Sequence, residues 1–109
     1  EVYRGLFAIS VCPSENVESP TIVGAQAANE LLNIIGIKAS FVLTEYNDKI
    51  YISSRSIDEI NVQIIMEKLG GGGHLNVAGA QLTGVTIVQA KRMIQDTLDE
   101  MLKEGDIEE

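Results

Sequence analysis

The sequence has few of the residues that carry covalent or metal chemistry. Its 109 residues include one cysteine, one histidine, two prolines and no tryptophan. The lone Cys12 excludes a disulfide within the chain, and its apolar surroundings predict a buried structural thiol in a reducing, cytosolic setting. No His/Asp cluster has ligand spacing, so we expect neither a metal site nor catalytic residues in this chain. A nucleophilic pair of Cys12 with His74 is left open, although no pattern favours it.

Long hydrophobic runs are also missing. No apolar stretch approaches the ~20 residues of a membrane-spanning helix, and no signal peptide opens the chain. Hydrophobic residues still make up 45% of the sequence, enough for one domain with a packed core. Because the first residue is glutamate rather than methionine, we expect residues 1 to 109 to be one soluble domain of a longer protein, without direct membrane contact.

Basic residues are scarce, which argues against long nucleic acid, because such a partner requires an extended positive track. The net charge is −8, but residues 96–109 carry −6 of it. Residues 69–90 contain no Asp, Glu, Lys or Arg. An anion bound along this uncharged segment would therefore meet no carboxylate close by in the sequence.

The first half of the chain predicts strands and one helix. Alternating apolar residues predict strands over 2–12, 37–45 and 50–55, with a tight hairpin turn at Asn47-Asp48. Ser19 and Pro20 are typical of a helix start. That helix is expected to end at Ile35, before Gly36 as the left-handed cap, and to be largely buried, because its polar stripe is narrow.

The second half predicts three helices, each read from a local pattern. The first opens with a capping box of Ser56 and Glu59 and ends at Leu69 before Gly70. The second is a short helix of small residues over 75–82. The third opens with the capping box of Thr86 and Gln89, runs to about Lys103, and leaves residues 104–109 as a frayed acidic tail. The predicted fold is α/β: one domain with a small mixed sheet packed with helices and a glycine-rich loop between helices.

Four consecutive glycines, Gly70 to Gly73, precede the only histidine, His74. Folding requires only Gly70, as a helix cap, whereas ordering a glycine run is entropically unfavourable. Without Cβ atoms, consecutive backbone N–H groups can line an anion-binding concavity. A helix starting at His74 would add its N-terminus, and the side chains of His74 and Asn76 would add donors. Neither a P-loop nor a dinucleotide fingerprint fits this spacing. The alternative is a flexible linker with an incidental histidine.

Arg55 is the second candidate, at the end of a predicted strand directly ahead of a helix. A guanidinium at this place can bind a phosphate through two hydrogen bonds. The alternative is a surface arginine paired with Asp58 or Glu59.

These motifs resemble a known family. Residues 70–81 are similar to the glycine–histidine motif of the DHH-associated domain, the C-terminal partner of the Asp-His-His domain in DHH phosphodiesterases. Ser53-x-Arg55-Ser56 resembles its upstream arginine motif, and the element order agrees over residues 2–103. Gln81 and Gly84-Val85-Thr86 look most like the membrane-bound cyclic-di-AMP phosphodiesterases of the GdpP type. Ala78-Gly79-Ala80 departs slightly from the adjacent alanines of relatives.

The resemblance implies a division of labour. Gly71, Gly72, Gly73 and His74 would cradle the substrate phosphate or base, with Asn76 nearby, and Arg55 would contact a phosphate. No residue here would be catalytic, and the expected cofactor, manganese, would sit in the N-terminal DHH domain of the same chain. The domain would be cytoplasmic in a membrane-anchored parent, with homodimerisation left open. The alternatives are a short-oligoribonucleotide exonuclease or phosphatase, a nucleic-acid-binding appendage, and a structural or dimerisation domain.

Overall fold

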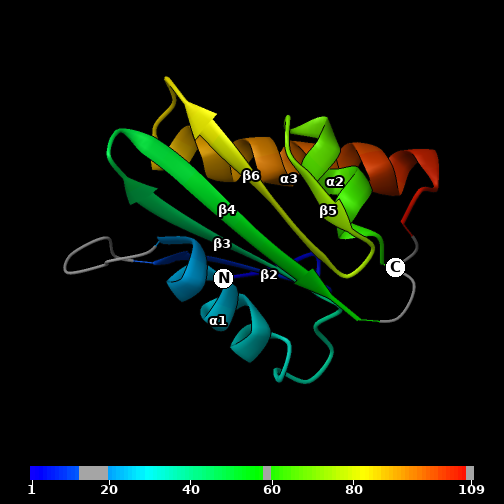
Figure 1. Cartoon of the computed structure of the whole chain (residues 1–109). Helices are drawn as coiled ribbons and strands as arrows, with labels where there is room; N and C mark the ends of the chain where they lie inside the picture. The colour runs from blue at the N-terminus through cyan, green and yellow to red at the C-terminus, as the bar shows by residue number, and fades with distance from the viewer. Residues whose placement is uncertain (13–19, 58–59, 108–109) are drawn as a thin grey trace.

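A mixed β-sheet divides the molecule into two unequal layers (Figure 1). The computed structural model describes residues 1–12, 20–57 and 60–107. The elements are β1 Val2–Tyr3, β2 Phe7–Cys12, α1 Pro20–Leu31, β3 Ala39–Tyr46, β4 Lys49–Ser56, α2 Val62–Lys68, β5 Gly72–His74, β6 Val77–Thr83 and α3 Ile87–Glu104. The strand order is β1-β2-β3-β4-β6-β5, with β2 and β3 parallel and the other neighbours antiparallel. The predicted α/β class with a small mixed sheet is confirmed.

The main core lies between the sheet and the helices α2 and α3. Phe7 and Phe41 pack edge to face with ring centroids 6.3 Å apart. Helix α3 turns one apolar stripe toward them, formed by Ala90, Ile94, Leu98 and Met101, all buried. The capping box of Thr86 and Gln89 is confirmed: Gln89 N donates to Thr86 Oγ1 at 3.1 Å, and Thr86 N donates to Gln89 Oε1 at 2.8 Å.

Helix α1 lies alone on the other face of the sheet and packs on β3 and β4 (Figure 1). Two small residues allow the close approach: a Cβ on Gly24 would lie 2.7 Å from Ser53 Oγ, and Ser40 Oγ donates to the Ala28 carbonyl at 2.6 Å. The prediction of a largely buried helix is wrong, because Ile22 is 60% exposed. Since α1 stops over β4, it leaves β6 and β5 open beside it.

Several predicted boundaries need correction. Helix α1 ends at Leu31, not at Ile35, and Gly36 takes a φ of +90° in the turn that follows. Ser19 lies outside the described residues. The predicted strand over 2–12 is a hairpin, because Arg4 and Gly5 take φ of 57° and 72° and fold β1 back on β2. Cys12 is half-buried rather than buried.

The other ends are defined by local capping. The hairpin turn at Asn47 and Asp48 is confirmed, with φ of 51° and 63°. Ser56 does not open α2: it ends β4, and its hydroxyl donates to the Ile60 carbonyl at 2.6 Å. The N-cap is Asn61, whose side chain accepts from Ile64 N at 3.2 Å. Glu59 lies outside the described residues.

The C-terminal end is packed further than predicted. Gly105 caps α3 with a φ of +81°, and Ile107 is 5% exposed against the core. Residues 104–107 are therefore ordered rather than frayed. None of the helices in the described ranges is long and apolar enough to cross a membrane.

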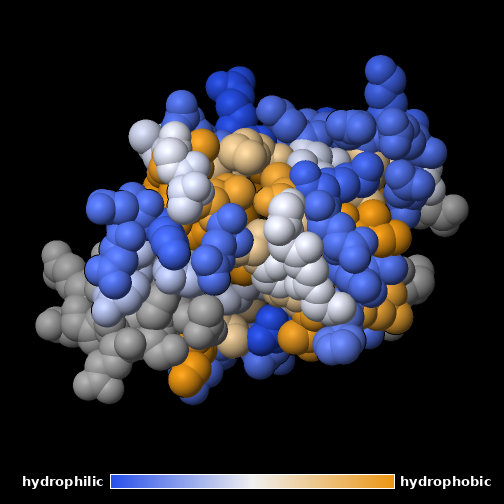
Figure 2. Space-filling view, turned by 45° about the horizontal axis from the view of Figure 1, so that its top comes forward, coloured by the Kyte–Doolittle hydropathy of each residue, from blue (hydrophilic) through white to orange (hydrophobic). Residues whose placement is uncertain are grey.

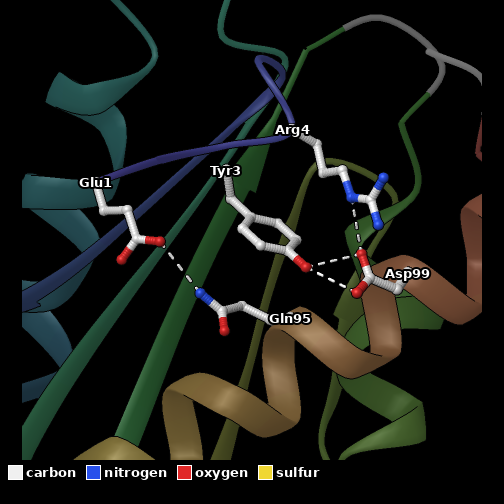
Figure 3. A network of polar contacts seen from close by, with 5 residues as sticks. All are labelled: Glu1, Tyr3, Arg4, Gln95 and Asp99. Carbon is white, nitrogen blue, oxygen red and sulfur yellow. Dashed lines mark hydrogen bonds and ion pairs between the residues drawn. The ribbon is translucent and has the colours of Figure 1, made fainter.

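A polar network ties the N-terminal hairpin to α3 (Figure 3). The Tyr3 hydroxyl lies 2.8 and 2.7 Å from the two Asp99 carboxylate oxygens, and Arg4 Nε donates to the same carboxylate at 3.0 Å. Gln95 and Lys91 contact the Glu1 carboxylate. Because the neutral Tyr3 hydroxyl donates to a charged acceptor, Asp99 raises the pKa of Tyr3 above its ordinary value.

We predict that Asp99→Asn lowers the pH at which Tyr3 ionises. The raised pKa means that the contact stabilises the fold fully below the ordinary tyrosine pKa of ~10 and is lost as pH rises through the folded value. An alkaline titration followed by tyrosinate absorbance measures the pH at which the tyrosines ionise. The chain has three tyrosines, so Tyr3 contributes one third of the signal. Asp96→Asn, on the exposed side of the same helix, is the control. An unchanged titration in Asp99→Asn would contradict the assignment.

Candidate functional site

The glycine run leads from helix α2 into an edge hairpin. Residues 72–74 form β5 and residues 77–83 form β6, joined by a turn at Leu75 and Asn76. The predicted helix over 75–82 is therefore wrong, and the run is not a loop between helices. In the described part of the chain no helix begins at or just after His74. The segment is a strand because alternate residues Ala78, Ala80 and Leu82 enter the core beside β4.

The strand register places side chains in three rows on the face that carries α1. Residues paired across a ladder point to the same side, and alternate residues point to opposite sides. The rows run from β4 through β6 to β5 and consist of Arg55–Val77–His74, Ser53–Gly79–Gly72 and Tyr51–Gln81. Arg55 and His74, 19 positions apart in the sequence, thus share one row and one face.

These rows form the floor of a groove of about 620 Å³. Its walls are Ala25 of α1 and the glycines from Gly70 to Gly73. The middle row holds no side chain larger than the Ser53 hydroxymethyl group, so the groove is hollow at its centre. Apolar residues stay accessible between the hydrophilic ones on the face shown in Figure 2, and Val77, in the groove, is 47% exposed. The volume is within the range of small-ligand sites.

The four glycines differ in whether the backbone conformation or a close contact requires glycine at that position. Gly70 has a φ of +87° at the end of α2. A Cβ on Gly71 would lie 2.1 Å from the Gly79 carbonyl oxygen, and one on Gly73, whose φ is +148°, would lie 2.5 Å from the Val77 oxygen. The fold therefore requires three glycines, not Gly70 alone. A Cβ on Gly72 would meet nothing within 4 Å, so packing does not explain this glycine.

Arg55 is a half-buried cation in the groove. Its Nη1 donates to the Ser54 carbonyl at 2.8 Å, and burial lowers the pKa of its guanidinium. Within residues 1–12, 20–57 and 60–107 it forms no ion pair; Asp58 and Glu59, the partners considered from the sequence, lie outside those ranges. A cation desolvated without a carboxylate beside it favours an anionic ligand.

His74 and Asn76 have different surroundings. His74 is exposed in the same row as Arg55, two strands away, or roughly 10 Å between backbones. The side-chain amide of Asn76 donates to Ser56 Oγ at 2.9 Å, and the backbone carbonyl of Asn76 accepts from Ser56 N at 3.1 Å. Asn76 thus braces the hairpin turn, while Arg55, Gly71, Gly72, Gly73 and His74 line the groove.

Sequence reasoning did not place Tyr51, Ser53, Gly79 and Gln81 in the site, although all four line the groove. The signal that could have found Gly79 and Gln81 is the alternation of residues 77–83, which puts both opposite β4 once the segment is read as a strand.

The groove is lined by charged, polar and backbone groups. Among the residues that the structure describes, no Asp, Glu or Cys lines it, and no three or more His, Cys, Asp and Glu residues gather into a possible metal site. Its functional groups are a cation, an imidazole, a tyrosine, an amide and exposed backbone. They suit a ligand with one anionic group and one flat, partly apolar group.

A family model and the similar proteins indicate the same family. The DHHA1 domain family matches residues 8–104. The chain is 47% identical over 100 residues to the cyclic-di-AMP phosphodiesterase PdeA of Listeria monocytogenes, covering 91% of this chain and 15% of that protein. It is 38% identical over 106 residues to the cyclic-di-AMP phosphodiesterase GdpP of Bacillus subtilis, covering 95% and 16%. The chain spans only about 15% of the length of these relatives.

A solved structure shows the same fold. An exopolyphosphatase-related protein of Bacteroides fragilis aligns with a TM-score of 0.80 at 23% identity, over 93% of this chain and 31% of that one. At this identity the likeness concerns the fold alone.

Proposed function

This chain belongs to the DHHA1 domain family, and from that membership and the groove we propose that it is the substrate-binding domain of a phosphodiesterase hydrolysing cyclic di-AMP or a related cyclic dinucleotide. The observation that carries the proposal is the row of Arg55 and His74 beside Gly72. It offers a cation, a hydrogen-bond donor and an unobstructed main chain to one phosphate.

Each group has a distinct part in holding the phosphate. The planar Arg55 guanidinium donates to two phosphate oxygens and regains the electrostatic stabilisation that burial removes. His74 donates from β5, which is separated from Arg55 on β4 by strand β6, so the phosphate is held from two sides. Gly72, with no side chain, lets the ligand lie against the backbone.

The metal that the family implies does not fit this groove. A manganese site is built from several oxygen or nitrogen ligands, such as carboxylates, imidazoles and waters. The described residues of the groove offer one histidine and no carboxylate. We place the manganese in a separate N-terminal DHH domain of the parent protein. In this division the present domain binds and orients the substrate, and the other domain cleaves it.

We predict that Arg55→Ala weakens binding of cyclic di-AMP to this chain about tenfold to a hundredfold, because a hydrogen bond to a charged group contributes ~1.5–3 kcal/mol. Titration followed by NMR measures the affinity. Arg92→Ala removes the same charge from α3, on the far side of the sheet, and should leave the affinity unchanged. Equal effects of the two substitutions would remove Arg55 from the site.

A further inference from the structure

The end of the groove away from Arg55 has an aromatic and an amide group side by side. Tyr51 on β4 is paired directly with Gln81 on β6, and both side chains line the groove. Tyr51 is half-buried and Gln81 is exposed. In the described part of the chain neither the Tyr51 hydroxyl nor the Gln81 amide forms a hydrogen bond with another residue. Both groups are thus available to a ligand.

The spacing of the two ends suits one nucleotide. Arg55 and Tyr51 are four residues apart on β4, or about 13 Å along the strand. Both residues line the same groove as the middle row between them, where Ser53, Gly79 and Gly72 leave room for a sugar. A phosphate at Arg55 therefore places an attached nucleoside over the floor, with its base toward Tyr51.

From this arrangement we infer that Tyr51 and Gln81 recognise the nucleobase, and that the groove holds a single nucleotide unit, one half of a cyclic dinucleotide. The inference rests on the proposed function, because the phosphate at Arg55 fixes the orientation. The Tyr51 ring stacks on the base, and Gln81 hydrogen-bonds to its edge.

The chemistry of Gln81 selects between purines. A glutamine amide presents one donor and one acceptor, which match the N6 donor and N7 acceptor of adenine. Guanine presents two acceptors, O6 and N7, on the same edge, so one of them would face the Gln81 carbonyl oxygen. The groove is therefore expected to prefer adenine to guanine.

The test is an NMR titration of this chain with three probes: AMP, GMP and ribose 5-phosphate. AMP should bind more tightly than ribose 5-phosphate, which lacks a base, and more tightly than GMP. Tyr51→Ala should weaken AMP roughly fivefold to a hundredfold, the range for lost base–aromatic stacking, and leave ribose 5-phosphate unchanged. Tyr51→Phe should keep the AMP affinity, and Gln81→Ala should remove the preference for AMP over GMP.

The control is Tyr46→Ala, at the far end of β3 and outside the groove lining, which should change none of these affinities. Equal binding of AMP and ribose 5-phosphate to the unaltered chain would overturn the inference, as would AMP binding that leaves the Tyr51 and Gln81 signals unmoved. A different result would contradict the proposed function itself: Arg55→Ala that weakens the binding of neither AMP nor ribose 5-phosphate. The comparison of probes on the unaltered chain does not depend on the folding of any variant.

Discussion

Replacing Gly71 with alanine should lower the melting temperature of the domain strongly. The new Cβ would lie 2.1 Å from the Gly79 carbonyl oxygen and 2.7 Å from the Ala80 Cα, both backbone atoms of the neighbouring strand β6. A backbone clash cannot be relieved by a rotamer change, and separating β5 from β6 would remove their hydrogen bonds. We expect a loss of about 4 kcal/mol or more, a large part of the stability of a domain whose total is ~5–15 kcal/mol.

Gly72, the next residue and the first of β5, provides the matched control. Its Cβ would point into open space, so Gly72→Ala should change the melting temperature little. Gly72→Val should also fold, but its two methyl groups would fill the middle of the groove and weaken cyclic di-AMP binding. Thermal unfolding and ligand titration on each variant separate the two effects. A melting temperature that falls as far in Gly72→Ala as in Gly71→Ala would contradict this distinction.

The elements that the sequence predicts well depend on neighbours in the chain. The capping box of Thr86 and Gln89 is formed by residues three apart, and the hairpin at Asn47-Asp48 requires only two residues that tolerate positive φ. The helix predicted over 75–82 was wrong because local propensity did not decide it. Alanine favours helix, but Ala78 and Ala80 are held by pairing with β4, more than 20 residues earlier.

The same distinction separates the predicted half of the groove from the missed half. Arg55 and His74 stand out by residue type, so the sequence identifies them without their geometry. Tyr51 and Gln81 are ordinary residues that become a site only through the register of β4 with β6. Gly72 stands out only in the structure. The sequence shows four equivalent glycines, and only the geometry shows that a Cβ would be accommodated at Gly72.

The largest difference in rate is expected between this chain alone and the chain joined to its N-terminal neighbour. We predict no turnover of cyclic di-AMP or of short oligoribonucleotides by the 109-residue chain in the presence of manganese. Hydrolysis at neutral pH requires an activated water, which metal ions supply by lowering its pKa toward ~7. Within ranges 1–12, 20–57 and 60–107 the groove has one imidazole and no carboxylate to hold such a metal or to act as a general base.

Turnover should appear when the DHH domain of the parent is present in the same polypeptide, with an enhancement of at least about 10⁶-fold over the uncatalysed reaction. In that longer protein Arg55→Ala should lower kcat/KM about tenfold to a hundredfold, while Arg92→Ala should not, because in the proposed site Arg55 binds the phosphate and Arg92 does not. Product release measured with and without chelator checks the metal requirement. Metal-dependent hydrolysis by residues 1–109 alone, abolished by His74→Ala, would overturn the division of binding and cleavage between two domains, because it would require a metal site built around His74 itself.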